Sequence, residues 1–303
     1  MKLSIIGAGK WGEALQSAFL QIEPTAAIAS RTPKNLPNFA SIEQALEAEA
    51  IVMCISVQAT SDWLRSCFRF SGQRILVASK GIETQSGRFL NVIYEEFAPR
   101  ENLAFLCGPG FAAEVKARKP TALTIASHSD ETAGMFMRFF PPQIKTYRIS
   151  DVIGAEIAGA YKNVIAIGAG VCEALKLGNN ARAALITRGL AEMTRFGEHF
   201  GAKAETFLGL AGAGDLFLTA TSELSRNFRV GLGLGSGRGL DEILANLGEV
   251  AEGVPTAWAI ARLSAENSLH TPIANEVTAL FGGKDPASSL QALLHSRAKE
   301  EEF

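Results

Sequence analysis

The chain has 303 residues, of which 47% are hydrophobic and 20% are charged, a composition that excludes a disordered protein. Its length has room for two domains of ordinary size. The formal charge of −2 at pH 7 provides no general attraction to nucleic acid, although a small anionic substrate needs only a local cluster of positive groups.

Residues 1–150 alternate short apolar runs with helical segments. Several of the runs are apolar throughout, as expected for strands covered on both faces of a parallel sheet. This repetition predicts an α/β fold with an N-terminal, doubly wound Rossmann-type domain. We expect strands at 3–6, 26–29, 51–55, 75–78, 103–107 and 123–126, and helices at 11–20, 42–49 and 59–68.

Residues 151–303 have long helical periodicity and little strand signal. We therefore predict an all-helical second domain, with glycine-rich breaks at 209–214 and 231–239 between its helices. The helices are expected at 153–175, 181–200, 240–245, 256–267, 273–281 and 289–299.

A nucleotide-binding signature follows the first predicted strand. Gly7, Gly9 and Gly12 match the G-x-G-x-x-G pattern and open an amphipathic helix. In this motif the glycines permit a tight turn, backbone approach to a pyrophosphate, and close helix–strand packing. Any glycine turn can mimic the pattern, so the further strand–helix units around it carry the interpretation.

The end of the second predicted strand bears on cofactor choice. A site selective for NAD usually has an acidic residue there to bind the ribose 2′-hydroxyl. This chain instead has Ser30-Arg31-Thr32, with Lys34 close by. Arg31 suits a 2′-phosphate and predicts a preference for NADPH, while a solvated loop charge is the alternative.

Polar residues interrupt apolar surroundings at two places in the second half. Lys162 and Asn163 lie inside an apolar helix, where a lysine must either extend to water or have partners. Burial would lower its pKa toward the range useful for proton transfer. Asp215, flanked by small and apolar residues, could pair with it or merely cap a helix.

Three further segments are candidates for contact with a ligand. Ser225-Arg226-Asn227 could hold a phosphate through the guanidinium and an amide, although a surface turn of this kind is common. Residues 79–81 and 108–112 follow predicted strands, and strand ends of doubly wound folds face the ligand crevice.

Together these segments resemble the ordered motifs of bacterial NAD(P)-dependent glycerol-3-phosphate dehydrogenases, from the first residues to about Ile273. The matching blocks are Gly7-x-Gly9-x-Trp11-Gly12, Ser79-Lys80-Gly81, Gly108-Pro109-x-Phe111-Ala112-x-Glu114, Lys162-Asn163-Val164, Gly212-Ala-Gly-Asp215-Leu, Ser225-Arg226-Asn227 and Glu249-Val250-x-Glu252-Gly253.

The resemblance implies reversible NAD(P)H-dependent reduction of glycerone phosphate to sn-glycerol 3-phosphate, which feeds glycerophospholipid synthesis. It implies proton transfer by Lys162, with Lys80, Asn163 and Asp215 as the other catalytic residues. The implied substrate contacts are Lys80, Gly108, Gly110, Lys162, Asp215, Thr219, Ser225, Arg226 and Asn227. The implied cofactor contacts are Gly7, Gly9, Lys10, Trp11, Gly12, Arg31, Lys80, Ala112, Arg226, Val250 and Glu252.

One position departs from the family, which usually has Ser or Thr where this chain has Gly110. The missing hydroxyl removes a hydrogen bond worth about 1 kcal/mol unless water replaces it. Two other functions stay open: a related β-hydroxyacid or 6-phosphogluconate-type dehydrogenase, and a regulator that senses NADPH without chemistry.

The four cysteines form no CxxC pair and have no metal-ligand spacing, so free thiols and no metal site are expected. Free thiols indicate a reducing cytoplasm. No window reaches the roughly 18 uninterrupted apolar residues of a membrane span. We expect a cytoplasmic enzyme with a small phosphorylated triose as substrate, no nucleic-acid partner, and a possible homodimer formed through the helical domain.

Overall fold

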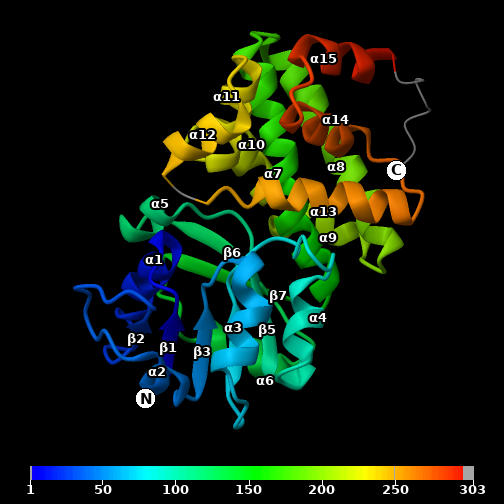
Figure 1. Ribbon diagram of the computed structural model, residues 1–303. Helices are drawn as coiled ribbons and strands as arrows, with labels where there is room; N and C mark the ends of the chain where they lie inside the picture. The colour runs from blue at the N-terminus through cyan, green and yellow to red at the C-terminus, as the bar shows by residue number, and fades with distance from the viewer. Residues whose placement is uncertain (1, 249, 296–303) are drawn as a thin grey trace. The chain divides into compact units, whose positions relative to one another are not determined.

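The computed structural model describes residues 2–248 and 250–295 and forms two compact units (Figure 1). The first unit consists of residues 1–80 and 88–156, and the second of residues 81–87 and 157–303. The domain boundary that we placed at residue 150 stays a prediction.

The first unit is built on a seven-stranded sheet with the order β2-β1-β3-β4-β5-β6-β7. Strands β1 to β5 are parallel, β6 is antiparallel to β5, and β7 is parallel to β6. The α/β fold is confirmed, although the antiparallel pair departs from a purely parallel sheet. The strands are β1 (Leu3–Ile6), β2 (Ala27–Ala29), β3 (Ala50–Met53), β4 (Arg74–Val77), β5 (Leu103–Cys107), β6 (Thr121–Ala126) and β7 (Ile144–Ile149).

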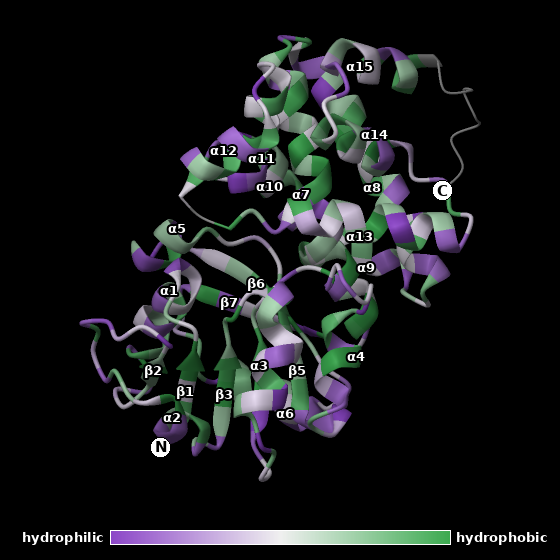
Figure 2. Cartoon of the chain, in the orientation of Figure 1, coloured by the Kyte–Doolittle hydropathy of each residue, from purple (hydrophilic) through white to green (hydrophobic). Residues whose placement is uncertain are grey.

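Strand β7 was not expected from the sequence. Its residues, Ile-Lys-Thr-Tyr-Arg-Ile, mix apolar and polar types without regular alternation, and most of them are partly or fully exposed. An edge strand is covered less completely than the central strands, which are buried along most of their length and appear hydrophobic in Figure 2. The continuous apolar signal that identified the other strands is therefore absent here.

Helices pack their apolar residues against this sheet. On α1 (Lys10–Phe19), Leu15 and Phe19 are fully buried, and the Phe19 ring meets Phe140 edge to face at 5.0 Å. The remaining helices of the unit are α2 (Ile42–Leu46), α3 (Thr60–Cys67), α4 (Leu90–Glu95), α5 (Ala112–Lys116) and α6 (Asp130–Met137), with short 3-10 turns η1 (Val57–Ala59) and η2 (Arg100–Asn102).

The described residues 157–248 and 250–295 of the second unit form helices joined by short connections and contain no strand, as predicted for this domain. It contains most of α7 (Val152–Ala174), then α8 (Gly178–His199), α9 (Ala204–Leu208), the π-helical turn η3 (Leu210–Gly214), α10 (Asp215–Ala220), α11 (Arg226–Gly235), α12 (Leu240–Leu247), α13 (Gly253–Glu266), α14 (Pro272–Phe281) and α15 (Pro286–His295).

Helix α7 forms the core of this unit. Within the described residues it is the one helix long and apolar enough to cross a membrane, and 94% of its most apolar window is buried inside the protein. A core helix of a globular protein has the same length and composition, so this property is weak evidence for a membrane span.

Two glycine-rich segments were expected to break the helices, and for much of their length this was wrong. Residues 210–214 form the turn η3, and residues 231–235 belong to α11. The glycines are required for close packing, because a Cβ atom on Gly231 would lie only 2.0 Å from the carbonyl oxygen of Ile167. Helices α7 and α11 therefore approach each other more closely than larger residues would allow.

Candidate active site

A buried ion pair joins Lys162 on α7 to Asp215 at the start of α10. The Lys162 ammonium donates to the Asp215 carboxylate and, at 2.9 Å, to the hydroxyl of Thr219. The Thr219 hydroxyl also donates to the Asp215 carboxylate at 3.3 Å. Lys162 is 7% exposed and Asp215 is 1% exposed. Lys162 therefore does not extend to bulk water, and Asp215 has a partner across the helix interface.

The local sequence explains this arrangement. Residues four apart on a helix share a face, so α10 presents Asp215 and Thr219 together toward α7. Apolar neighbours on α7 exclude water from the Lys162 amine. A buried charge of this kind is stable only while its partners remain, and loss of one partner costs about 3–5 kcal/mol. The group combines a positive charge with an exchangeable proton in a dry environment, as acid–base chemistry requires.

The residue after Lys162 ties three helices together. Asn163 donates to the Gly159 carbonyl at 3.2 Å and accepts from the Asn227 amide at 2.8 Å. The Asn227 carbonyl oxygen in turn accepts from the backbone N–H of Gly253 at 3.0 Å. Both asparagines are buried, so their amides hold the N-terminal ends of α11 and α13 against α7. This amide chain was not foreseen, because its members are far apart in the sequence.

Ser225 and Arg226 lie at the N-terminus of α11. The Ser225 hydroxyl is buried and accepts from the Phe228 N–H at 3.2 Å, which makes it the N-cap rather than part of a surface turn. Arg226, the first residue of the helix, is exposed. A guanidinium beside a helix N-terminus suits a phosphate.

In the first unit, the glycine fingerprint leads from β1 into α1. Gly7 has φ +110°, and a Cβ atom there would lie 2.5 Å from the Cys54 carbonyl oxygen. A Cβ atom on Gly12 would lie 2.0 Å from the carbonyl oxygen of Gly7, whereas one on Gly9 would meet no atom within 4 Å. The space over Gly9 is open, and no side chain caps the helix, so the turn fits the pyrophosphate of a dinucleotide.

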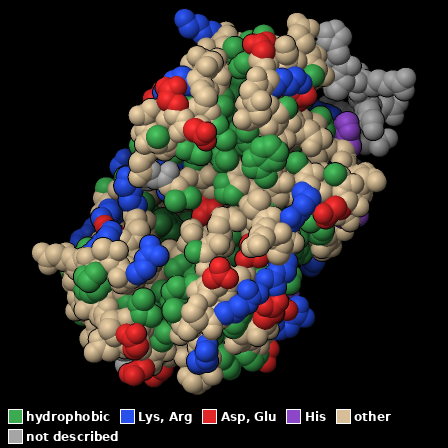
Figure 3. Space-filling view, in the orientation of Figure 1, with side chains coloured by type: hydrophobic (Ala, Val, Ile, Leu, Met, Phe, Trp, Pro, Cys, Tyr) green, Lys and Arg blue, Asp and Glu red, His purple; other side chains and the backbone are tan. Residues whose placement is uncertain are grey.

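Basic residues surround this turn, and Figure 3 shows several Lys and Arg side chains on this face of the first unit. Lys34 donates to Glu13 at 2.8 Å and to the Ala8 carbonyl, and Lys116 donates to Glu13 at 2.9 Å. Hydrogen bonds from both lysines lower the pKa of Glu13. Arg31 is exposed and makes no hydrogen bond or ion pair with any described residue. Of these three cations, Arg31 is thus the one whose charge no described residue pairs with.

The carboxyl ends of β4 and β5 bring Lys80 and Gly108 together. The Lys80 ammonium donates to the Gly108 carbonyl at 2.9 Å, and Gly108 has φ +98°, a conformation that favours glycine. Ser79 donates to the Ile55 carbonyl beyond β3. Three neighbouring strand ends are therefore connected at the edge where doubly wound folds bind ligands.

Gly110 lies against the Trp11 indole. A Cβ atom on Gly110 would be 3.3 Å from the Trp11 ring and 3.4 Å from the Leu123 side chain. A serine at this position would therefore require the indole to shift by a few tenths of an ångström. Ala112 lies two residues further along the chain, begins α5 and is partly exposed.

The remaining predicted residues make fewer described contacts. Lys10 is the exposed first residue of α1, and Val250 is 58% exposed. Glu252 precedes α13 and is partly exposed, while Glu249 of the same motif lies outside the described residues. No three His, Cys, Asp or Glu side chains among the described residues gather as a metal site would require.

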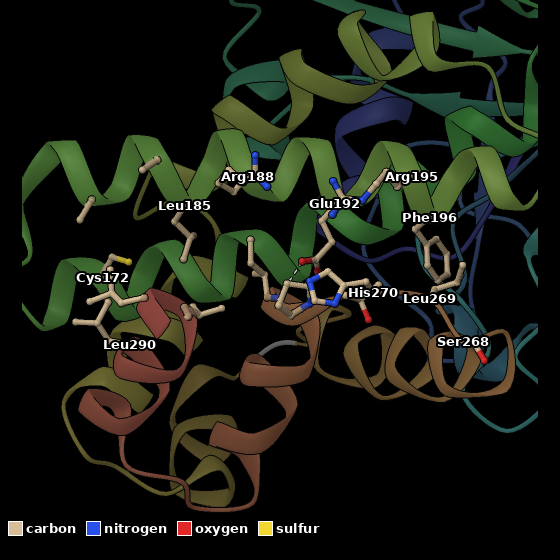
Figure 4. A pocket seen from close by; sticks show the side chains of 17 residues that line it. Cys172, Leu185, Arg188, Glu192, Arg195, Phe196, Ser268, Leu269, His270 and Leu290 are labelled. Atoms are coloured by element: carbon tan, nitrogen blue, oxygen red, sulfur yellow. Dashed lines mark hydrogen bonds between the residues drawn. The ribbon is translucent and has the colours of Figure 1, made fainter. Parts of the chain in front are cut away.

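A buried carboxylate that the sequence did not indicate bonds to Tyr161, the residue before Lys162. Glu192 on α8 accepts from the Tyr161 hydroxyl at 2.8 Å and from the N–H groups of Ile273 and Ala274 at 2.9 and 3.0 Å (Figure 4). Burial raises the pKa of Glu192, while these hydrogen bonds oppose the rise. Glu192 thereby closes the N-terminus of α14 and holds the residue that precedes Lys162.

Comparison with known proteins agrees with this geometry. Residues 22–133 match the family model described as the N-terminus of NAD-dependent glycerol-3-phosphate dehydrogenase, and residues 151–291 match the model of its C-terminus. A glycerol-3-phosphate dehydrogenase [NAD(P)+] of Campylobacter jejuni subsp. doylei is 56% identical over 294 residues, which cover 97% of this chain and 99% of the relative. The corresponding protein of Sulfurimonas denitrificans is 54% identical over 293 residues, with the same two coverages.

A solved structure gives the same result. The crystal structure of glycerol-3-phosphate dehydrogenase from Coxiella burnetii matches with a TM-score of 0.88 and 31% identity, covering 97% of this chain and 98% of that one. The resemblance seen in the sequence motifs is confirmed, and the relatives' names indicate NAD or NADP as cofactor. This chain belongs to the NAD-dependent glycerol-3-phosphate dehydrogenase family, whose members are oxidoreductases.

Proposed function

We propose that this chain catalyses the reversible NAD(P)H-dependent reduction of glycerone phosphate to sn-glycerol 3-phosphate. The observation that carries the proposal is the buried Lys162, held by Asp215 and Thr219, in a chain whose relatives bear the name of this activity. We assign dinucleotide binding to residues 1–150 and substrate chemistry to residues 151–303.

Lys162 is the proton donor in this reaction. The bound nicotinamide supplies the hydride that reduces the carbonyl carbon. As negative charge develops on the carbonyl oxygen, the Lys162 ammonium stabilises it and then transfers a proton to it. Asp215 and Thr219 keep the amine in one position, so no reorganisation is needed at the moment of transfer. In the reverse direction the neutral amine takes the proton back.

Substrate orientation comes from separate groups. Arg226 at the N-terminus of α11 binds the phosphate, and binding energy from that remote group orients the carbonyl. Ser225 and Asn227 contribute by fixing the helix end, since their side chains already bond to protein groups. Lys80, anchored on Gly108, supplies a second positive charge to the substrate.

NADPH is the preferred reductant in this proposal, because Arg31 stands where an acidic residue would select NAD. We place the enzyme in the cytoplasm, with its product supplied to glycerophospholipid synthesis. We also propose a homodimer formed through the helical unit, where Leu208 and Phe217 are 72% and 50% exposed. Sedimentation equilibrium measures the mass directly, and a monomer at micromolar concentration would contradict the dimer.

One initial-rate experiment tests the function. Oxidation of NADPH and NADH is followed with glycerone phosphate. In parallel, reduction of NADP+ and NAD+ is followed with β-hydroxyacids and with 6-phosphogluconate. Turnover restricted to glycerone phosphate is expected. Turnover of the other substrates alone would assign a related dehydrogenase, and cofactor binding without turnover would assign a sensor.

A further inference from the structure

We propose that a cavity in the second unit, separate from the Lys162 site, binds an amphiphilic anion: a carboxylate or phosphate monoester attached to an aliphatic chain. The cavity lies among α8, the segment before α14, and α15, and has a volume of about 780 Å³ (Figure 4). Small-molecule sites commonly have volumes of about 300–1,000 Å³. None of the residues that line it was assigned to cofactor or substrate above.

The two ends of the cavity differ in chemistry because one helix face changes character along its length. Residues spaced three or four apart on α8 all line the cavity. The earlier turns contribute small and apolar side chains, and the later turns contribute three charged ones and a phenylalanine. In order along the helix these residues are Ala181, Ala184, Leu185, Arg188, Glu192, Arg195 and Phe196.

The charged end contains an excess of positive groups. Arg188 is exposed and makes no hydrogen bond or ion pair with any residue in the described part of the chain. Arg195 influences Glu192 electrostatically, but the Glu192 carboxylate is already bonded to Tyr161 and to the start of α14. Two guanidinium groups therefore line the charged end of the cavity, where the one carboxylate already accepts hydrogen bonds from protein groups.

An unpartnered hydroxyl provides a second and independent observation. Thr271 lines the cavity and is 2% exposed, yet its hydroxyl has no hydrogen-bond partner among the described residues. Buried polar atoms are nearly always hydrogen-bonded, so this hydroxyl in the wall of the cavity lacks an acceptor that a bound ligand would supply. A carboxylate or phosphate oxygen would accept this hydrogen bond.

The opposite end extends the cavity into apolar surroundings. A smaller hollow of about 40 Å³ shares Leu185, Leu290 and Leu293 with the main cavity and is otherwise lined largely by aliphatic residues such as Val171 and Leu280. An aliphatic chain placed there would lose contact with water, which contributes about 0.8 kcal/mol for each buried methylene. A cationic end joined to an apolar end favours one occupant that has both properties.

Isothermal titration calorimetry with the full chain tests the proposal. The probes are decyl phosphate and decanoate. The two half-probes for comparison are inorganic phosphate, which has only the anionic group, and 1-decanol, which has only the aliphatic chain. Saturable binding of one equivalent of decyl phosphate or decanoate is expected, at least ten times tighter than either half-probe. Whichever of decyl phosphate and decanoate binds more tightly identifies the head group that the site prefers.

Variants locate the binding. Arg188→Gln and Thr271→Val should each weaken binding several-fold, and Ala184→Trp should abolish it by filling the cavity. Arg138→Gln, an exposed arginine of the first unit without described partners, is the matched control and should bind as the parent does. Arg188 is a surface residue, so its variant stays informative even if a buried substitution disturbs folding.

Four outcomes would overturn the proposal: no saturable binding, equal binding of the half-probes, equal loss in Arg138→Gln, or no loss in Arg188→Gln and Thr271→Val. Binding that occurs only after deletion of residues 296–303 would show that the chain's own C-terminal segment fills the cavity. A change of sedimenting mass in Ala184→Trp, without probe binding to the parent, would assign the cavity to contact with a second copy.

Discussion

Lys162 and Asp215 form a buried ion pair although they lie 53 positions apart in the sequence. The contact holds the buried amine in one position, which is the property that the proposed chemistry uses. The proposed reactivity and part of the stability of the helical unit therefore depend on the same contact.

Replacing Lys162 with alanine should lower kcat by roughly 10³-fold or more, because both the proton and the stabilising charge are lost. The dissociation constant for NADPH should change less than about threefold, since the fingerprint glycines are untouched. Steady-state rates and fluorescence titration measure the two effects. Lys145→Ala, on exposed β7, is the control, and equal losses in both variants would exclude a specific role for Lys162.

Arg31→Ala should raise the KM for NADPH by about tenfold or more while leaving that for NADH nearly constant, because only NADPH carries the 2′-phosphate. Lys34→Ala offers a comparison. Lys34 bonds to Ala8 and Glu13 beside the fingerprint, so its loss should weaken both cofactors alike. Equal effects of Arg31→Ala on the two cofactors would contradict the assignment.

Arg226→Ala should raise the KM for glycerone phosphate by about 10²-fold, with little change in the weak rate on unphosphorylated glycerone, because the guanidinium acts on the phosphate. Initial rates with the two ketones measure this difference. An equal loss with both ketones would mean that Arg226 acts on the reacting centre instead.

Gly253→Ala should destabilise the protein by about 1–3 kcal/mol, because a Cβ atom there would lie 2.6 Å from the Asn227 side-chain oxygen and 3.0 Å from the Asn163 carbonyl. Gly239→Ala, where a Cβ atom meets nothing within 4 Å, should be nearly neutral. Urea unfolding compares the two. A Gly253→Ala variant as stable as Gly239→Ala would show that the amide chain is not rigid.

Glu156→Gln should alter the pH dependence of stability. Burial raises the pKa of Glu156 from 4.5 to about 8, although the Asn91 N–H hydrogen-bonds to its carboxylate. Between these two values the folded chain binds more protons than the unfolded one, so its free energy of unfolding falls as pH rises. The glutamine variant should lose part of this slope between pH 5 and pH 8 in thermal unfolding scans. An unchanged slope would exclude Glu156 as its source.

Local patterns in the sequence predicted much of the fold. The apolar runs located β1 and β5 to the residue, because buried strands carry a continuous apolar signal. The polar edge strand β7 lacked that signal, and the glycines of α11 were interpreted as breaks when they serve close packing. Composition does not distinguish a glycine that ends a helix from one that allows a second helix to pack closely against it.

The candidate site was predictable to a similar extent. A lysine in an apolar helix and a carboxylate among glycines indicated their pairing, because each would be costly to bury alone. The Asn163–Asn227–Gly253 chain and Glu192 gave no such indication. The Asn227–Asn163 bond joins residues 64 positions apart, and the Ala274–Glu192 bond joins residues 82 positions apart. Only folding brings such distant residues together.

The three hydrogen bonds to Glu192 mean that one carboxylate serves two purposes at once. It anchors a structural helix, and it holds Tyr161, whose backbone neighbour Lys162 is the proposed proton donor. A mutation that neutralises Glu192 would therefore lower both the stability of the fold and the rate of turnover. No substitution that removes this charge should lower one without the other. Heat inactivation and melting of the helical unit should accordingly coincide in temperature.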